Sequence, residues 1–254
     1  MRRCRVDRPI IAGDSGDDGI PMNLDQQRRY ARQIMLPELG EAGQQKLLAA
    51  RVLVVGAGGL GSALIPYLAA AGVGTLGIID PDRVELSNLA RQVIHESGDI
   101  GRLKVESARD RVEELNPDVR VVPHAEALTP ENAERIIAAY DVVADGCDNF
   151  ATRFVVNDAC VKRGTPLVSA AIAGWQGQVM SILPGGPTYR DLVHEDAPEA
   201  NTCRESGVIG PLAGIIGSMQ ALEVLRVLLG TPALGGKLAI YDGITAQQRV
   251  VTLT

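Results

Sequence analysis

The chain has 254 residues and a mass of 26.9 kDa, which fits one large α/β unit or two small domains. With 46% hydrophobic and 22% charged residues it can bury a substantial core, so a largely disordered chain is excluded. A net charge of -6 and an aromatic content of 3% argue against nucleic acid as a partner, because basic patches and stacking faces are scarce.

The first 24 residues form a polar stretch rich in Gly and Asp, without hydrophobic periodicity. We expect a flexible N-terminal extension there. Its aspartates argue against a mitochondrial presequence, and its composition does not match a secretory signal peptide. The remaining residues, 25–254, are expected to form a single domain.

The 28 residues between Arg51 and Asp80 carry no charge, which is long enough to cross a bilayer. Seven glycines and Pro66 interrupt this run. The run therefore divides into a strand at 52–55, a glycine turn, a helix to about residue 71 and a strand at 75–79. A buried βαβ unit explains it better than a membrane helix, so we expect no membrane partner and a soluble protein. The four cysteines are far apart and form no C-x-x-C pair, and no signal peptide is recognised, so we expect a reduced, cytoplasmic setting.

Helices and strands continue to alternate along the chain. We expect helices at about 103–115, 130–139 and 149–162, and strands at 119–123, 142–145 and 167–171. Repeated βα units predict an α/β fold with a doubly wound, largely parallel Rossmann-like sheet and helices on both faces. Beyond it we expect a strand at 178–183, a crossover loop at 184–206, an apolar helix at 212–229, and C-terminal antiparallel strands at 237–241 and 247–253.

The glycine turn contains Gly56, Gly58, Gly59 and Gly61, directly after a strand and before a helix. Glycines there allow a tight turn, bring backbone N–H groups close to phosphate and let the helix pack on the strand. The next strand ends at Asp80, 24 residues beyond Gly56, where a carboxylate can accept hydrogen bonds from ribose hydroxyls. The pattern predicts nucleotide binding, with NAD as one candidate, and a turn needed only for packing as the alternative.

The following segment argues against a dehydrogenase. Arg91 and Lys104 are expected near the carboxyl edge of the sheet, where they can neutralise charge developing on phosphorus. Hydride transfer needs no such pair. Asp148, after the strand at 142–145, is placed to hold Mg²⁺ against phosphate oxygens, but capping of the helix that starts at Asn149 explains it equally well.

Seven motifs occur in order: RRYARQ (28–33), VGAGGLG (55–61), AGVGTL (71–76), SNLARQ (87–92), KVESARD (104–110), DGCDN (145–149) and TCRESGVIGP (202–211). Over residues 25–254 the chain resembles the ThiF/MoeB/HesA family, bacterial relatives of ubiquitin-activating enzymes. The resemblance favours ATP over NAD. It also implies a nucleotide-binding part over about 25–170 and a carrier-binding part over about 171–254.

The resemblance implies an adenylyltransferase that uses ATP and Mg²⁺. The C-terminal Gly-Gly carboxylate of a small ubiquitin-like sulfur carrier, of ThiS or MoaD type, would attack the α-phosphate and release pyrophosphate, for thiamine, molybdopterin or related sulfur transfer. Arg32 would reach in from the other subunit of a homodimer. Residues implied to contact ATP or its metal are Gly59, Asp80, Ser87, Asn88, Arg91, Lys104, Asp148 and Asn149.

Cys203 matches the cysteine that links covalently to the activated carrier in ThiF-like members. Arg204 beside it would lower the pKa of the thiol, while a free loop cysteine is the other interpretation. We expect Cys147 and Cys160 to be packing residues and Trp175 to be a core aromatic rather than part of a tail channel.

The segment 187–192 lacks the C-x-x-C pair with which many family members hold zinc, and no second pair follows, so we expect no structural zinc. The resemblance does not extend to a rhodanese-like region, so a separate sulfur donor is expected. Two alternatives stay open. One is adenylation of a peptide or another carboxylate or amide substrate, and the other is a non-catalytic nucleotide-binding scaffold or regulatory protein.

Overall fold

The computed structural model describes residues 22–193 and 207–253. Its centre is one mixed sheet of eight strands in the order β3-β2-β1-β4-β5-β6-β7-β8. The strands are β1 (Arg51–Val55), β2 (Thr75–Ile79), β3 (Arg120–His124), β4 (Val142–Asp145), β5 (Leu167–Ala173), β6 (Gln176–Ile182), β7 (Lys237–Asp242) and β8 (Gln247–Thr252). Strands β1 to β5 are parallel and β6 to β8 antiparallel, which confirms the expected architecture.

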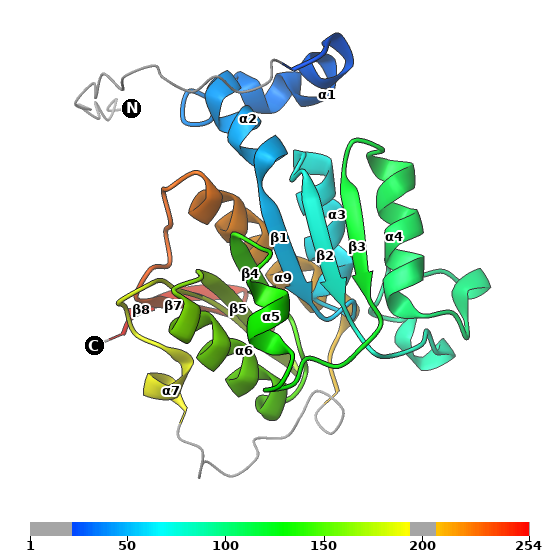
Figure 1. Cartoon of the computed structure of the whole chain (residues 1–254). Helices are drawn as coiled ribbons and strands as arrows, with labels where there is room; N and C mark the ends of the chain where they lie inside the picture. The colour runs from blue at the N-terminus through cyan, green and yellow to red at the C-terminus, as the bar shows by residue number, and fades with distance from the viewer. Residues whose placement is uncertain (1–21, 194–206, 254) are drawn as a thin grey trace.

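Helices cover both faces of this sheet (Figure 1). They are α1 (Leu24–Ile34), α2 (Gly40–Ala49), α3 (Gly61–Ala71), α4 (Lys104–Leu115), α5 (Ala133–Ile137), α6 (Phe150–Arg163), α7 (Tyr189–Leu192) and α9 (Gly210–Leu228), with short 3-10 helices η1 (Leu86–Asn88) and η2 (Ser97–Asp99). Because successive side chains of a strand point to opposite faces of the sheet, the sheet contributes side chains to two hydrophobic cores, one on each face. Val52 and Val54 pack with α3, α4 and α9, whereas Leu53 and Val55 pack with α5 and α6.

The uncharged run at 52–79 is β1, α3 and β2, as predicted. The remaining apolar helix, α9, is long and apolar enough to cross a membrane by length and composition alone. In this structure it lies against α3, β4, β5 and β6, and Ile216 and Val224 are fully buried.

Helices α1 and α2 were not predicted, and α1 begins at Leu24, within the stretch expected to be an N-terminal extension. Asn23 and Gln26 form a capping box at the start of α1. Tyr30 of α1 is buried against Gly72, where an added Cβ would lie 2.6 Å from the ring carbon Cζ. Because Gly72 ends α3 with a φ of 84°, glycine serves both the turn and the contact with Tyr30.

Two further expectations differ from the structure. The predicted crossover loop contains α7, whose Tyr189 packs edge-on against Phe154 of α6. Trp175 is not a core aromatic, because it lies in the β5–β6 turn and is 49% exposed. Most of the expected N-terminal extension, residues 194–206 of the loop, and Cys203 lie outside the described residues.

Gly77 provides a test of packing in β2. An added Cβ would lie 2.1 Å from the Tyr140 hydroxyl, which is hydrogen-bonded to His124 Nε2 at 2.9 Å. Gly77→Ala should therefore cost about 1–3 kcal/mol of unfolding free energy, a fall of roughly 2–12 °C in Tm. Gly98→Ala, whose Cβ would meet only Glu96 at 3.7 Å, is the control. Equal thermal stability of the two variants would contradict the packing.

Candidate nucleotide-binding site

Two adjoining cavities lie where the carboxyl ends of β1, β2 and β4 meet. The glycine-loop cavity, lined by Gly56, Gly58, Gly59 and Asp80 among others, has a volume of about 220 Å³. The rim cavity, lined by Ser87 and Asn88 among others, has a volume of about 570 Å³. Residues common to both are Asp82, Arg91, Gln92, Lys104, Asp148 and Val208. In open α/β sheets, ligands bind in this crevice, at the point where the strand order reverses.

The glycine turn presents free backbone donors. Gly56 has a φ of 95°, and a Cβ on Gly61 would lie 2.3 Å from the Gly56 carbonyl oxygen, so the turn closes tightly beneath the cavity. Within the described chain, no group accepts a hydrogen bond from the N–H groups of Gly58, Gly59 or Leu60. These groups stand at the N-terminus of α3, an arrangement that binds anions such as phosphate.

Asp80 braces the glycine turn from the neighbouring strand. One carboxylate oxygen accepts the Ala57 N–H at 2.8 Å, and the other accepts the Asp82 N–H at 2.9 Å. Burial raises the pKa of Asp80, against the lowering effect of Lys104 and of the two backbone N–H groups. Each oxygen has one protein donor and keeps a free lone pair, so a contact with ribose remains open.

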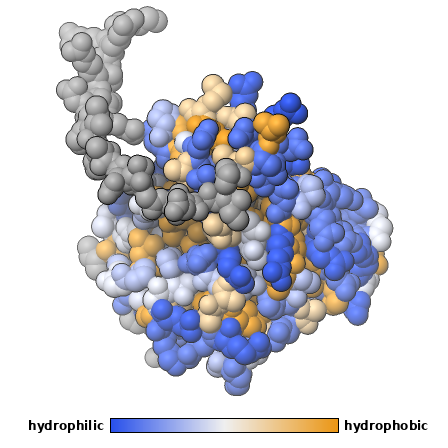
Figure 2. Space-filling model, turned by 45° about the horizontal axis from the view of Figure 1, so that its top comes forward, coloured by the Kyte–Doolittle hydropathy of each residue, from blue (hydrophilic) through white to orange (hydrophobic). Residues whose placement is uncertain are grey.

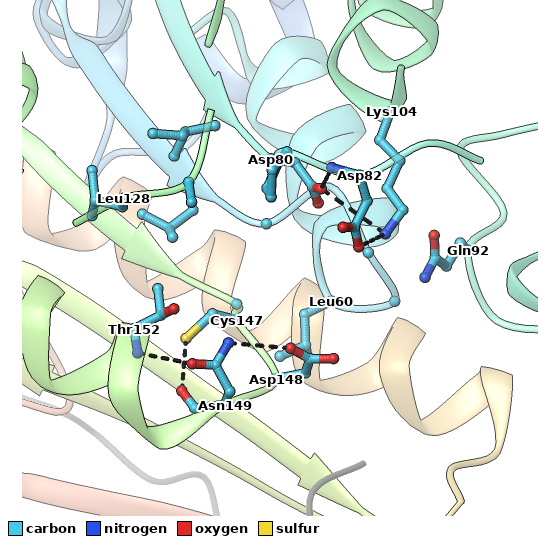
Figure 3. A pocket seen from close by; sticks show the side chains of 18 of the residues that line it. Leu60, Asp80, Asp82, Gln92, Lys104, Leu128, Cys147, Asp148, Asn149 and Thr152 are labelled. Atoms are coloured by element: carbon cyan, nitrogen blue, oxygen red, sulfur yellow. Dashed lines mark hydrogen bonds and ion pairs between the residues drawn. The ribbon is translucent and has the colours of Figure 1, made fainter. Parts of the chain in front are cut away.

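The cations lie close to the glycine turn and to Asp80, since the Lys104 ammonium is 4.0 Å from an Asp80 carboxylate oxygen. Lys104 opens α4, is buried, and holds Asp82 at 2.9 Å through its ammonium group (Figure 3). Arg91 donates to the Ser87 carbonyl oxygen at 3.1 Å and lines both cavities. The sequence predicted both cations but not the partner, Asp82.

Ser87 and Asn88 form the wall of the rim cavity. The buried Asn88 accepts the Glu85 N–H at 3.2 Å, while the Ser87 hydroxyl lies 3.3 Å from the Glu85 carboxylate. Their polar groups thus reach the cavity from one short turn held by Glu85.

Asn149, not Asp148, caps helix α6. The Asn149 side-chain oxygen accepts the Thr152 N–H at 2.8 Å (Figure 3). The capping interpretation of Asp148 is therefore wrong. The Asp148 carboxylate is exposed, lies 3.4 Å from the Asn149 amide nitrogen and lines both cavities, so it can serve as a metal ligand.

Beneath Asp148, a buried ion pair holds the end of β4. Asp145 is fully buried and lies 3.9 Å from the Arg153 guanidinium. Arg153 also donates to the carbonyl oxygens of Cys147 at 2.6 Å and Ala170 at 3.0 Å. The position of the loop that carries Asp148 is thereby fixed. The role of Arg153 was not predicted from the sequence, because a basic residue within a predicted helix is usually a solvent-exposed side chain.

Cys147 and Cys160 agree with the packing role expected for them. Burial raises the pKa of the Cys147 thiol well above its usual range. Burial also raises the pKa of Cys160 to about 12. Neither sulfur is therefore a ready thiolate nucleophile.

Gln92 is a second residue that the sequence did not single out as a site residue, although it ends the SNLARQ motif. It lines both cavities and is only 4% exposed, and its buried Oε1 has no hydrogen-bond partner among the described residues. A buried amide without a partner is costly, so a ligand or water group is expected to satisfy it.

Arg32 lies apart from this cluster. It is exposed on α1, at the end of the sheet opposite the cavities (Figure 1), and its guanidinium lies 3.9 Å from the Met35 sulfur. The described part of the chain thus brings together the glycines, acids and cations of the expected nucleotide site, with Gly61 beneath the turn, but not Arg32.

No group of three or more His, Cys, Asp or Glu residues that could hold a metal ion occurs in ranges 22–193 and 207–253. A Mg²⁺ ion bound here would depend on Asp148 together with phosphate oxygens and water, the usual arrangement for Mg²⁺. The expected absence of zinc stays a prediction.

Two curated proteins illustrate what this chain resembles. The family model described as "ThiF family" matches residues 30–254. "Adenylyltransferase and sulfurtransferase MOCS3" of Bos taurus is 49% identical over 231 residues, covering 89% of this chain and 50% of that protein. The "SAMP-activating enzyme E1" of Haloferax volcanii is 46% identical over 229 residues, covering 89% of this chain and 84% of that protein. The chain spans about half the length of the MOCS3 relatives.

Solved structures agree on the fold. PaaA matches with a TM-score of 0.78 and 23% identity, covering 94% of this chain and 78% of its own. MccB of E. coli, in a crystal structure with ATP, matches with a TM-score of 0.73 and 21% identity, covering 89% and 71%. At these identities the likeness establishes the fold alone.

The cations give the first test of the site. Arg91→Ala should weaken binding of a non-hydrolysable ATP analogue with Mg²⁺ by about tenfold or more, because a charge-assisted contact to phosphate is lost. Titration calorimetry measures the change. Arg111→Ala, on the exposed side of α4, is the control. Unchanged affinity in the Arg91 variant would remove that residue from the site.

Proposed function

The chain belongs to the ThiF family, and from that premise we propose that it is an adenylyltransferase acting on a small ubiquitin-like carrier protein. The names of the MOCS3 and SAMP-activating relatives support this activity and this class of substrate. One observation carries the proposal: free backbone donors, two cations and an exposed carboxylate line one crevice.

The proposed reaction joins two groups that repel each other. An oxygen of the carrier's C-terminal carboxylate forms a bond to the α-phosphorus of ATP. The bond from that phosphorus to the α–β bridging oxygen breaks, and pyrophosphate leaves with the electron pair. Such a site must align both anions and offset their charge.

The residues that line the crevice can offset this negative charge. The N–H groups of Gly58 and Gly59 can hold phosphate oxygens, and Arg91 and Lys104, which line the same cavity, offset the negative charge. Mg²⁺, when held by Asp148, would neutralise further charge on the phosphates.

A third cavity supports an approach route for the carrier's tail. The β5–β6 cavity, with a volume of about 260 Å³, is lined by Ala171, Gly177 and Ile240, among others, and it meets the glycine-loop cavity at Asp148 and Asn149. A slender tail ending in Gly-Gly suits such a route, because it carries no side chains at the reacting end. The C-terminal part of the chain would then bind the carrier.

We further infer a homodimer in which Arg32 completes the partner's site. Arg32 stands at the far end of its own sheet, beside the exposed side chains of Met35 and Leu36. Figure 2 shows apolar groups among charged ones on the face that carries α1 and α2. Tyr67 on α3 and Leu222 on α9 are 59% and 61% exposed. Exposed apolar side chains of this kind are suited to burial in an interface between subunits.

Pyrophosphate exchange tests the activity. With wild-type protein and a panel of Gly-Gly carriers, at least one carrier should drive exchange of labelled pyrophosphate into ATP. Asp148→Asn should lower the rate about 100-fold or more, because the carboxylate for Mg²⁺ is lost. Asp158→Asn, at a carboxylate paired with Arg190 on the surface, is the control.

Near-normal exchange in the Asp148 variant would remove that residue from the catalytic set. ATP binding without exchange on any carrier would favour the scaffold interpretation, and exchange with peptides only would favour the peptide interpretation.

Subunit mixing tests the role of Arg32. Arg32→Ala and Asp148→Ala should each be inactive, but a refolded equal mixture should recover up to about a quarter of wild-type sites, because each mixed dimer contains one intact site. If Arg32 acted within its own subunit, every site in the mixture would carry a defect and no activity would return.

A further inference from the structure

A buried histidine lies behind the glycine turn, outside the cavities. His95 is 5% exposed, and its Nε2 lies 2.9 Å from the Ala57 carbonyl oxygen. Its Nδ1 lies 2.8 Å from the Ser107 hydroxyl on α4. Neither cavity of the nucleotide site has His95 in its lining, and its hydrogen bond to the site is the one to Ala57.

The partners of His95 define which nitrogen carries hydrogen. A carbonyl oxygen only accepts, so Nε2 must donate to Ala57. The Ser107 hydroxyl lies 2.8 Å from Asp99 as well as from Nδ1, and its single hydrogen serves one of them at a time. When it serves Nδ1 the ring is neutral, and when it serves Asp99 the ring donates from both nitrogens. The Nε2–H bond to Ala57 is present in both states.

Charged groups surround the ring. Burial lowers the pKa of His95, and Lys104 adds to this, while Asp99 and Asp80 oppose it. Burial works to raise the pKa of Asp99, but hydrogen bonds from Glu96, Ser107 and Arg102 together hold it below its usual value. Asp99 therefore remains an acceptor.

Ala57 is thus held on two sides. Its N–H donates to Asp80 at 2.8 Å, and its carbonyl oxygen accepts from His95 at 2.9 Å. Both backbone groups of this residue thus have partners, whereas the next N–H groups, of Gly58 and Gly59, remain without acceptors among the described residues. A glycine turn held in this way loses little conformational freedom when an anion binds to its free N–H groups.

We infer that His95 is a positioning residue, which holds the glycine turn in the conformation that accepts the ATP phosphates by donating from Nε2 to the Ala57 carbonyl. The inference rests on the proposed function, since it concerns the same nucleotide site. It assigns His95 an effect on ATP affinity and not on the chemical step.

Two variants of similar size separate positioning from bulk packing. A Gln side chain can place its amide nitrogen near the position of the imidazole Nε2, whereas the shorter Asn reaches only toward Ser107. His95→Asn should weaken binding of a non-hydrolysable ATP analogue with Mg²⁺ about tenfold, and His95→Gln less than about threefold. In pyrophosphate exchange, His95→Asn should raise KM for ATP and change kcat by less than about threefold.

Ser107→Ala is the matched control, because it removes the partner of Nδ1 and leaves the bond to Ala57 in place. Its affinity for the analogue should stay within about threefold of wild type. Equal weakening by the Asn and Gln variants, or wild-type affinity in His95→Asn, would overturn the inference. Because analogue binding is measured directly, failure of the wild type to bind would instead count against the proposed function.

A measurement on the wild type covers the case in which His95→Asn does not fold. The chain has three histidines, so ¹⁵N-labelled imidazole resonances can be assigned by substitution. The His95 Nε2 should carry hydrogen from about pH 6 to about pH 8.5, that is, from just below the ordinary histidine pKa to about two units above it, and its resonance should shift when the analogue binds. A bare Nε2 in that range would also overturn the inference.

Discussion

The hydrogen bond from the Ala57 N–H to Asp80 ties the first glycine turn to the end of the neighbouring strand, and the rest of the site depends on it. This bond crosses from β1 to β2 at the point where the strand order turns toward β4. It fixes which backbone groups face the crevice. Arg91 from the turn after η1, Lys104 from α4 and the Asp148 carboxylate before α6 then reach the same space from other elements.

Much of the fold could be predicted from the sequence, because buried parallel strands appear as short apolar runs. The bounds of β2 and β4 agree with the predicted strands. The helix α1 was missed because most of its residues are polar, although the capping pair Asn23 and Gln26 was a usable signal. The short helix α7 is stabilised by contacts of Tyr189 and Arg190 with α6, which local sequence does not reveal.

The residues of the site could be predicted better than their partners. Motifs identified Lys104 and Asp148, but only the three-dimensional structure pairs Lys104 with Asp82 and gives the cap of α6 to Asn149. The contacts of Arg153 and His95 span many residues along the chain, so no local pattern signals them. Trp175 was placed wrongly because an aromatic side chain is more often buried than exposed at a turn.

The ion pair between Lys104 and Asp82 has a consequence for ligand selection. Without ligand, the Lys104 ammonium is already paired with the Asp82 carboxylate. An incoming anion must therefore displace this carboxylate in order to bind the ammonium. A monophosphate carries little negative charge and competes poorly with Asp82 for the Lys104 ammonium, whereas a triphosphate carries more negative charge and competes better. The intrinsic counter-ion therefore favours a triphosphate over a monophosphate at this site.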